Sequence, residues 1–245
     1  MSDLWFYILA GFVAQIVDGA LGMAYGLTAS SFLISFGIAP ASASATVHAA
    51  EVFTTGFSGL SHHYYGNVDK KLFWRLLIPG VIGAAVGAYV LASLPGEQFS
   101  PFVSAYLLII GVVIIVKAFR EFPPVAVTRY VAPLGFFGAM IDALGGGGWG
   151  PVVASTLLAR GSHVRMTVGT VNAVEFFVTL TASIVFFLTL GLSNWNIILG
   201  LAIGGILAAP IGAYAVKRVP LRPLMFFVGL LIIFLSARTL LKALG

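Results

Sequence analysis

Two glutamates stand inside segments of the chain that are otherwise strongly apolar. Glu51 lies within residues 41–64 and Glu175 within residues 164–190. A carboxylate in hydrocarbon is costly, so such a residue faces the interior of a helix bundle and commonly marks an ion or proton pathway. The structural alternative is a neutral carboxyl group that only hydrogen-bonds to a neighbouring helix. Because the chain carries two such acids, we favour a role in moving protons.

Further polar residues accompany each glutamate at helical spacing. Around Glu51 they recur every three or four residues and form one polar stripe on an apolar helix: Ser44, His48, Thr55, Ser58 and His62. The end of this stripe, with a second histidine and two tyrosines, is typical of a membrane-interface belt. The stripe around Glu175 is shorter and holds Asn172 and Thr179. We predict that His48 and Asn172 contact a bound substrate and that the histidine is not a metal ligand, since no metal-ligand cluster accompanies it.

Two glycine-rich segments each begin with an aspartate: Asp18–Gly26 and Asp142–Gly150. Glycine permits positive φ and close backbone approach, which leaves N–H groups free to point at a ligand. Each segment also precedes a predicted helix, whose first N–H groups favour negative charge. These two segments, called the tips, are therefore predicted to cradle an anion; the alternative is that their glycines only let helices pack closely. The tip residues predicted to bind substrate are Gly22, Met23, Tyr25, Gly26, Gly146, Gly147, Gly148, Trp149 and Gly150.

The two aspartates that open the tips allow two interpretations. Asp18 and Asp142 are either caps of the loop that follows or further acids that, with Glu51 and Glu175, couple the movement of substrate to protons. The sequence leaves both interpretations open. The second tip has more glycine and less side-chain bulk than the first, so we expect it to contact substrate more closely.

The composition excludes an ordinary soluble domain. Hydrophobic residues make up 60% of the 245 residues and charged residues 9%. Apolar runs of about 20 residues, the length that spans a bilayer, recur along the chain, so we expect one membrane domain, 1–245, in contact with lipid. The first run lacks the features of a signal peptide. The net charge of +5 is explained by basic loops and not by a nucleic-acid partner, and the absence of cysteine removes disulfides and thiolate metal sites.

The chain repeats itself at an offset of 124 residues. Gly11, Asp18, Gly22, Gly26, Thr46 and Glu51 reappear as Gly135, Asp142, Gly146, Gly150, Thr170 and Glu175. We predict an all-α integral membrane protein of two repeats, 4–120 and 129–243. Each repeat is a broken or re-entrant helical hairpin followed by three transmembrane helices. Internal repeats of this kind are typical of transporters whose site lies between the two halves.

The basic residues indicate how each hairpin is threaded. If each first segment enters and returns on the same side, eleven of the 13 Lys and Arg residues fall on one face and only Arg238 and Lys242 on the other. Cytoplasmic loops are rich in these residues. We therefore predict inverted repeats in a bacterial inner membrane, with both termini outside. A re-entrant hairpin and two thin crossings give the same charge count; arms of about fifteen residues are short for a 30 Å core and favour the re-entrant form.

The duplicated motif resembles that of a known family. Each half opens with G-F-x-x-x-x-x-D-x-x-x-G-x-x-x-G, at 11–26 and 135–150, and continues with T-V-x-x-x-E, at 46–51 and 170–175. This pattern, over essentially the whole chain, resembles the TauE/SafE sulfite-exporter family of bacterial membrane permeases. The resemblance implies movement of small sulfur-containing anions such as sulfite, sulfonates or sulfoacetate, or of other organic acids. His48 opposite Asn172 departs from the symmetry of the pattern.

Together these features predict a secondary active transporter of a small anion that works by alternating access at a mid-membrane site, with protons or sodium as the coupling ion. A passive anion channel is the alternative, although ionised glutamates in a pore would repel anions. We expect neither an enzyme nor a cofactor, because no nucleophile is placed beside His48 and Glu51. The sequence does not name the anion, the direction of transport or the oligomeric state.

Overall fold

Helices make up most of the chain that the computed structural model describes, which comprises residues 2–23, 25–94, 100–120, 130–160, 162–191, 193–215 and 220–244. In chain order the elements are α1 (Ser2–Leu21), α2 (Tyr25–Ser35), α3 (Pro40–Tyr64), α4 (Lys70–Ala92), α5 (Ser100–Phe119), α6 (Val131–Gly145), the short π-helical segment η2 (Gly150–Ala154), α7 (Ser155–Ala159), α8 (Val164–Leu190), α9 (Trp195–Ala215) and α10 (Leu221–Leu244). These residues include no strand. The all-helical prediction is confirmed, and the predicted breaks fall between α1 and α2 and between α6 and η2.

Local sequence features set several of the helix ends. Asp69 caps α4, because its carboxylate accepts hydrogen bonds from the backbone N–H groups of Lys71 at 2.8 Å and Leu72 at 3.1 Å. Gly22 follows α1 and Gly146 follows α6, and both have a φ of 66°. Glycine adopts this left-handed conformation without the steric penalty that a β-carbon brings. The two tips therefore begin with the same backbone turn.

Four helices of the described chain are long and apolar enough to cross a membrane: Lys70–Ala92, Pro101–Phe119, Val164–Leu190 and Trp195–Ala215. Shorter apolar helices occupy Leu4–Ala20, Val131–Gly145 and Met225–Leu241. Large apolar side chains, Trp5 and Leu188 among them, lie exposed over the outer surface. Such a surface is expected where hydrocarbon and not water surrounds the bundle. The chain therefore has the features of a helical, multi-pass membrane protein.

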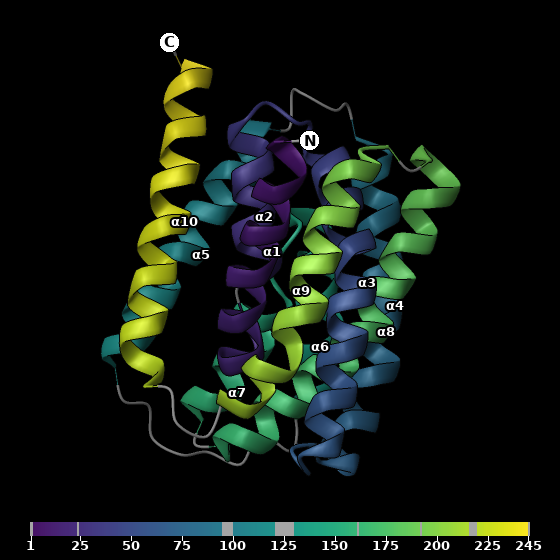
Figure 1. The fold of residues 1–245 in the computed structure, drawn as a ribbon, viewed down its shortest axis with the longest axis vertical. Helices are drawn as coiled ribbons and strands as arrows, with labels where there is room; N and C mark the ends of the chain where they lie inside the picture. Colours follow the sequence, from purple (N-terminus) through teal and green to yellow (C-terminus); the bar gives the residue numbers. More distant parts are fainter. Residues whose placement is uncertain are drawn as a thin grey trace.

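The helices pair across the two halves of the chain. α1 packs along α9, α4 along α6, α3 along α8 and α5 along α10, with further contacts of α3 to α9 and of α4 to α8. Figure 1 shows α5 and α10 at one side of the bundle and α3, α4 and α8 at the other, with α1 beginning and α10 ending toward the upper end. The offset of 124 residues relates α1 to α6 and α4 to α9, so the pair α1–α9 has its counterpart in the pair α6–α4. In the pairs α3–α8 and α5–α10, the two helices are each other's counterparts. Each main contact thus has a counterpart in the other half.

Small residues permit the closest of these contacts. A β-carbon at Gly111 of α5 would lie 3.1 Å from the carbonyl oxygen of Gly229 on α10, and one at Gly229 would lie 2.9 Å from the carbonyl oxygen of Gly111. A β-carbon at Gly19 of α1 would lie 2.9 Å from the Cα of Gly212 on α9. Membrane helices commonly approach each other through small residues. These glycines, including Gly19 within the first tip, therefore serve helix packing.

Candidate functional site

The two tips meet inside the bundle, next to one of the predicted coupling acids. A β-carbon at Gly26 would lie 2.9 Å from Glu51 Oε1, 3.0 Å from the carbonyl oxygen of Gly146 and 3.0 Å from Gly147 Cα. The hydroxyl group of Ser30, on the arm after the first tip, donates a hydrogen bond to the Gly146 carbonyl. The carboxyl group of Glu51 therefore lies where the first tip crosses the second.

The remaining tip glycines are also in contact with neighbouring backbone or side chains. Gly150 packs against the backbone of Gly22 and Met23 so closely that no β-carbon would fit between them. A β-carbon at Gly148 would lie 2.7 Å from the hydroxyl oxygen of Tyr106 on α5, and this hydroxyl donates to the carbonyl oxygen of Gly147 at 3.2 Å. The structure thus brings all the predicted tip glycines into one region.

Asp142 holds the second tip in its conformation. Its Oδ1 accepts hydrogen bonds from the backbone N–H groups of Gly148 at 2.7 Å and Trp149 at 3.0 Å, and the residue is buried. The sequence assigned N–H groups of this tip to a bound anion. In the structure the carboxylate of the protein itself occupies this part of the predicted cradle.

Asp18 has the corresponding position at the first tip. Its Oδ1 accepts a hydrogen bond from the backbone N–H of Tyr25 at 3.5 Å, seven residues further on, as Asp142 does from Trp149. Both aspartates thus make the capping contact that was one of their two interpretations. Their role in coupling stays a prediction.

His48 connects α3 to the second tip through Asp142. Its Nε2 lies 3.1 Å from Asp142 Oδ2, and its Nδ1 lies 2.8 Å from the carbonyl oxygen of Ser44. The hydroxyl of Ser44 lies 3.2 Å from the same Nδ1 but donates to the Ala143 carbonyl over the shorter distance of 2.8 Å. A carbonyl only accepts, so Nδ1 donates to it, and the contact of Nε2 with Oδ2 ties α3 to the second tip.

Asn172, the counterpart of His48, makes different contacts. Its Oδ1 accepts a hydrogen bond from the hydroxyl of Ser58 at 2.7 Å, and its amide nitrogen donates to the Val168 carbonyl at 3.2 Å. The amide nitrogen faces the first tip, since a β-carbon at Gly22 would lie 3.5 Å from it. His48 and Asn172, the two polar residues predicted to contact substrate, thus both lie beside a tip, but they make different hydrogen bonds.

Glu51 and Glu175 lie in the interior of the bundle, with exposed fractions of 2% and 6%. They stand on α3 and α8, which pack along each other. One turn beyond them, the hydroxyl oxygens of Thr55 and Thr179 approach to 3.4 Å. Thr55 and Thr179 are equivalent under the offset of 124. The two glutamates therefore flank the line along which the two halves meet.

The four predicted coupling acids lie near one another. Glu175 is within electrostatic reach of Asp18, Glu51 and Asp142. Its Oε2 is buried, and none of the described residues donates a hydrogen bond to it. Among all the residues that the structure describes, no group of three or more His, Cys, Asp or Glu side chains is arranged to hold a metal ion. The four predicted coupling residues thus form one acidic cluster.

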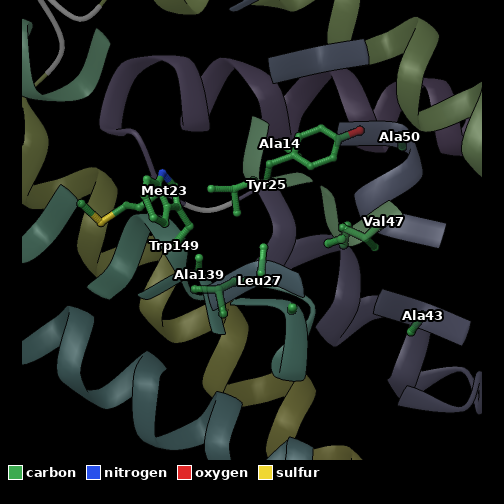
Figure 2. Close-up of a cluster of buried hydrophobic side chains, with 14 of the residues drawn as sticks. Ala14, Met23, Tyr25, Leu27, Ala43, Val47, Ala50, Ala139 and Trp149 are labelled. Atoms are coloured by element: carbon green, nitrogen blue, oxygen red, sulfur yellow. The ribbon is translucent and has the colours of Figure 1, made fainter. Parts of the chain in front are cut away.

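The bulky tip side chains belong to the hydrophobic core. Met23, Tyr25 and Trp149 are each at most 1% exposed. The Tyr25 hydroxyl donates to the Leu201 carbonyl at 2.9 Å, and the Trp149 indole N–H donates to the Val171 carbonyl at 3.1 Å. Figure 2 shows the rings of Tyr25 and Trp149 directed to different parts of this cluster. Contact of these three side chains with a substrate stays a prediction.

Sequence reasoning missed a buried polar group near the first tip. His62, expected at the membrane interface, is 0% exposed, and its Nε2 donates to the Gly19 carbonyl at 3.1 Å. The amide of Asn67 lies 3.1 Å from His62 Nδ1 and only donates there, so the imidazole is neutral. The position of His62 on the polar stripe was the available signal. Asn67 follows α3 in a loop, where no pattern marks it.

The chain resembles known membrane proteins over almost its whole length. The family model described as sulfite exporter TauE/SafE matches residues 7–239. The chain is 43% identical over 252 residues to Probable membrane transporter protein YtnM of Bacillus subtilis (strain 168), which covers 99% of this chain and 84% of that relative. No solved structure matches it. The matched region includes both tips and both buried glutamates.

Proposed function

Because the chain belongs to the TauE/SafE family, as its duplicated motif indicated, we propose that it is a secondary active transporter of a small sulfur-containing or organic anion such as sulfite, a sulfonate or sulfoacetate. The family and the curated relative support a membrane transporter in general. The choice of anion, the coupling ion and the mechanism belong to the proposal.

The observation that carries the proposal is the position of the Asp142 carboxylate at the second tip. Its oxygens lie 2.7 Å from the Gly148 nitrogen, 3.0 Å from the Trp149 nitrogen and 3.1 Å from His48 Nε2. A small oxyanion presents similar oxygens to such donors. In the proposed cycle Asp142 and the substrate alternate at these donors, and the structure corresponds to the step in which Asp142 occupies them.

Positive charge must accompany the substrate to such a site. The cluster of Glu51, Glu175, Asp18 and Asp142 is buried, and any two members that are ionised repel each other. A further anion increases this repulsion unless protons or cations enter with it. We propose that Glu51 and Glu175 bind and release the coupling protons, with sodium as the alternative ion.

Alternating access requires two halves that move relative to each other. We propose that residues 4–120 and 129–243 are inverted repeats with re-entrant hairpins. The matched pairs α1–α9 and α4–α6 and the approach of Thr55 to Thr179 support a two-fold relation between them. In this proposal both termini face the outside of a bacterial inner membrane.

The test is transport by the purified protein in liposomes. Uptake of labelled sulfite, methanesulfonate, sulfoacetate and acetate is measured under an imposed proton gradient, a sodium gradient or neither. We expect uptake of at least one sulfur-containing anion, driven by one of the two gradients. Unlabelled anion inside the liposomes should accelerate entry of labelled anion, because a carrier exchanges its substrate. Uptake without this acceleration would indicate a channel, and no uptake of any of the four anions would contradict the proposed function.

The coupling acids are tested in the same assay. Glu51→Gln and Glu175→Gln keep the size of the side chain and remove its titration, so each is expected to abolish the dependence of uptake on the proton gradient. Asp69→Asn, at an exposed helix cap, is the control and should leave that dependence intact. If both glutamine variants respond to the gradient like the unmodified protein, the coupling role is wrong while the transport function stands.

A further inference from the structure

A groove of about 830 Å³ lies on the outer surface between α3, α4 and α8, away from both tips. Its walls are largely aromatic and include Phe53, Phe57, Trp74 and Phe176. Phe57 is 49% and Trp74 61% exposed, so the groove opens sideways from the bundle. This side corresponds to the group of α3, α4 and α8 in Figure 1. In a membrane protein such an opening faces lipid.

Helices α3 and α8 are in close contact along the floor of the groove. Gly56 and Gly59 both line it. A β-carbon at Gly56 would lie 3.2 Å from a ring carbon of Phe176, and one at Gly59 would lie 3.0 Å from Ala173 Cα. Thr55, which also lines the groove, is 1% exposed. The groove therefore has a closed floor where α3 meets α8.

One end of the groove is cationic. It is lined there by His63, next to the last residue of α3, and by Lys70, the first residue of α4. The carboxylate of the adjacent Asp69 accepts from two backbone N–H groups at the start of α4. Among the described residues no carboxylate forms an ion pair with Lys70. Trp74, one turn further along α4, is a residue typical of the headgroup level of a bilayer.

The length of the groove matches one leaflet of a membrane. From Val52 to His63 an α-helix rises about 16 Å. The hydrocarbon core of a bilayer is about 30 Å thick, so the groove extends from the cationic end to about the middle of the core. Its volume lies within the range of about 300–1,000 Å³ that is usual for small-molecule sites.

We propose that this groove binds an anionic phospholipid, with the phosphate at Lys70 and His63 and an acyl chain against Phe53, Phe57 and Phe176. Basic pockets between transmembrane helices bind acidic lipid headgroups. The aromatic walls accept the acyl chain. The site lies apart from the tips, so it does not depend on which anion the protein carries.

The experiment is native mass spectrometry of the full-length protein in detergent, titrated with phosphatidylglycerol or with phosphatidylcholine of the same acyl chains. We expect tighter binding of phosphatidylglycerol. Lys70→Gln should weaken phosphatidylglycerol binding about fivefold, the effect of one basic residue near an acidic headgroup. Lys71→Gln, the adjacent exposed lysine outside the groove, should change it less than twofold.

A second pair of variants tests the acyl-chain part of the groove. Phe57→Ala should weaken both lipids to the same degree, whereas Phe227→Ala, at an exposed position on α10, should weaken neither. Equal binding of the two lipids would overturn the proposal, and so would a phosphatidylglycerol preference that survives Lys70→Gln. A dimer that forms in place of lipid binding and is lost in Phe57→Ala would also overturn it, because the groove would then accept a second copy of the chain.

Discussion

The two tips share a backbone plan but are fixed by different side chains. At each tip an aspartate accepts a hydrogen bond from the N–H seven residues further on. At the second tip, Asp142 also accepts from Gly148 and meets His48 at 3.1 Å. At the first tip the position of His48 is taken by Asn172, which bonds to Ser58 of the neighbouring helix. The two tips thus share the backbone turn and the cap, whereas the polar partner differs.

This difference indicates unequal roles for the two tips. The second tip carries a hydrogen-bonded pair, His48 and Asp142, whose members come from different segments of the chain. At the equivalent position beside the first tip, Asn172 bonds instead to the hydroxyl of Ser58. We therefore expect substitutions at the second tip to have the larger consequences.

Asp142→Ala is expected to have the largest effect on stability. It leaves two buried N–H groups and His48 without their acceptor, and removal of one member of a buried pair costs about 3–5 kcal/mol. Thermal unfolding of the purified protein measures the loss. Asp69→Ala is the matched control, because Asp69 also accepts from two backbone N–H groups but at an exposed cap worth about 1 kcal/mol. Equal losses of stability in the two variants would show that neither the burial of Asp142 nor its contact with His48 adds to the stability of the protein.

Gly146→Ala and Gly22→Ala compare the tips at equivalent positions. Both glycines have a φ of 66°, so both substitutions carry the left-handed penalty of about 1–2 kcal/mol. The new β-carbon at position 22 would lie 3.4 Å from Val168, an ordinary contact, whereas at position 146 it would overlap the Ser30 side chain. We expect Gly146→Ala to lower the unfolding temperature further than Gly22→Ala. The same decrease in both variants would contradict the closer packing of the second tip.

His48→Asn makes the two halves alike at this position. A hydrogen bond to a charged group is worth about 1.5–3 kcal/mol, and its loss frees Asp142 from α3. In the proposed cycle His48 is also one of the donors to the substrate, so its loss weakens substrate binding. Uptake below saturation should then fall about tenfold, which corresponds to 1.4 kcal/mol. Liposome uptake at several substrate concentrations measures it, with Asn172→Ala as the comparison at the first tip. Unchanged uptake by His48→Asn would remove His48 from the transport mechanism.

The helices could be predicted closely from local sequence. α8 occupies Val164–Leu190, as the apolar run predicted, and α3 begins one residue before its predicted start, at Pro40. A membrane helix needs a fixed length of apolar residues and must bond its own backbone groups. Its ends therefore depend on neighbouring residues and can be located without tertiary information. The inverted orientation of the two halves has no such local test and stays a prediction.

The contacts at the tips could not be predicted in the same way. The sequence placed Asp142 before a glycine run, but its bonds to Gly148 and Trp149 depend on how that run folds back. His62 was predicted at the interface and is buried, because the end of α1 lies against it and offers the Gly19 carbonyl. Contacts between segments that are distant in sequence leave no periodic signal, so these bonds appear only in the structure.

The smallest effect is expected where the two halves touch through equivalent residues, Thr55 and Thr179. Each hydroxyl donates to a carbonyl of its own helix, of Glu51 and of Phe176, so neither proton is left for the 3.4 Å contact between them. A double-mutant cycle of Thr55→Val and Thr179→Val should therefore give a coupling energy below about 0.5 kcal/mol. Thermal unfolding of the four proteins measures it. A coupling above about 1 kcal/mol would mean that the threonines bond to each other. Such a bond would resist the relative movement of the halves that the proposed cycle includes.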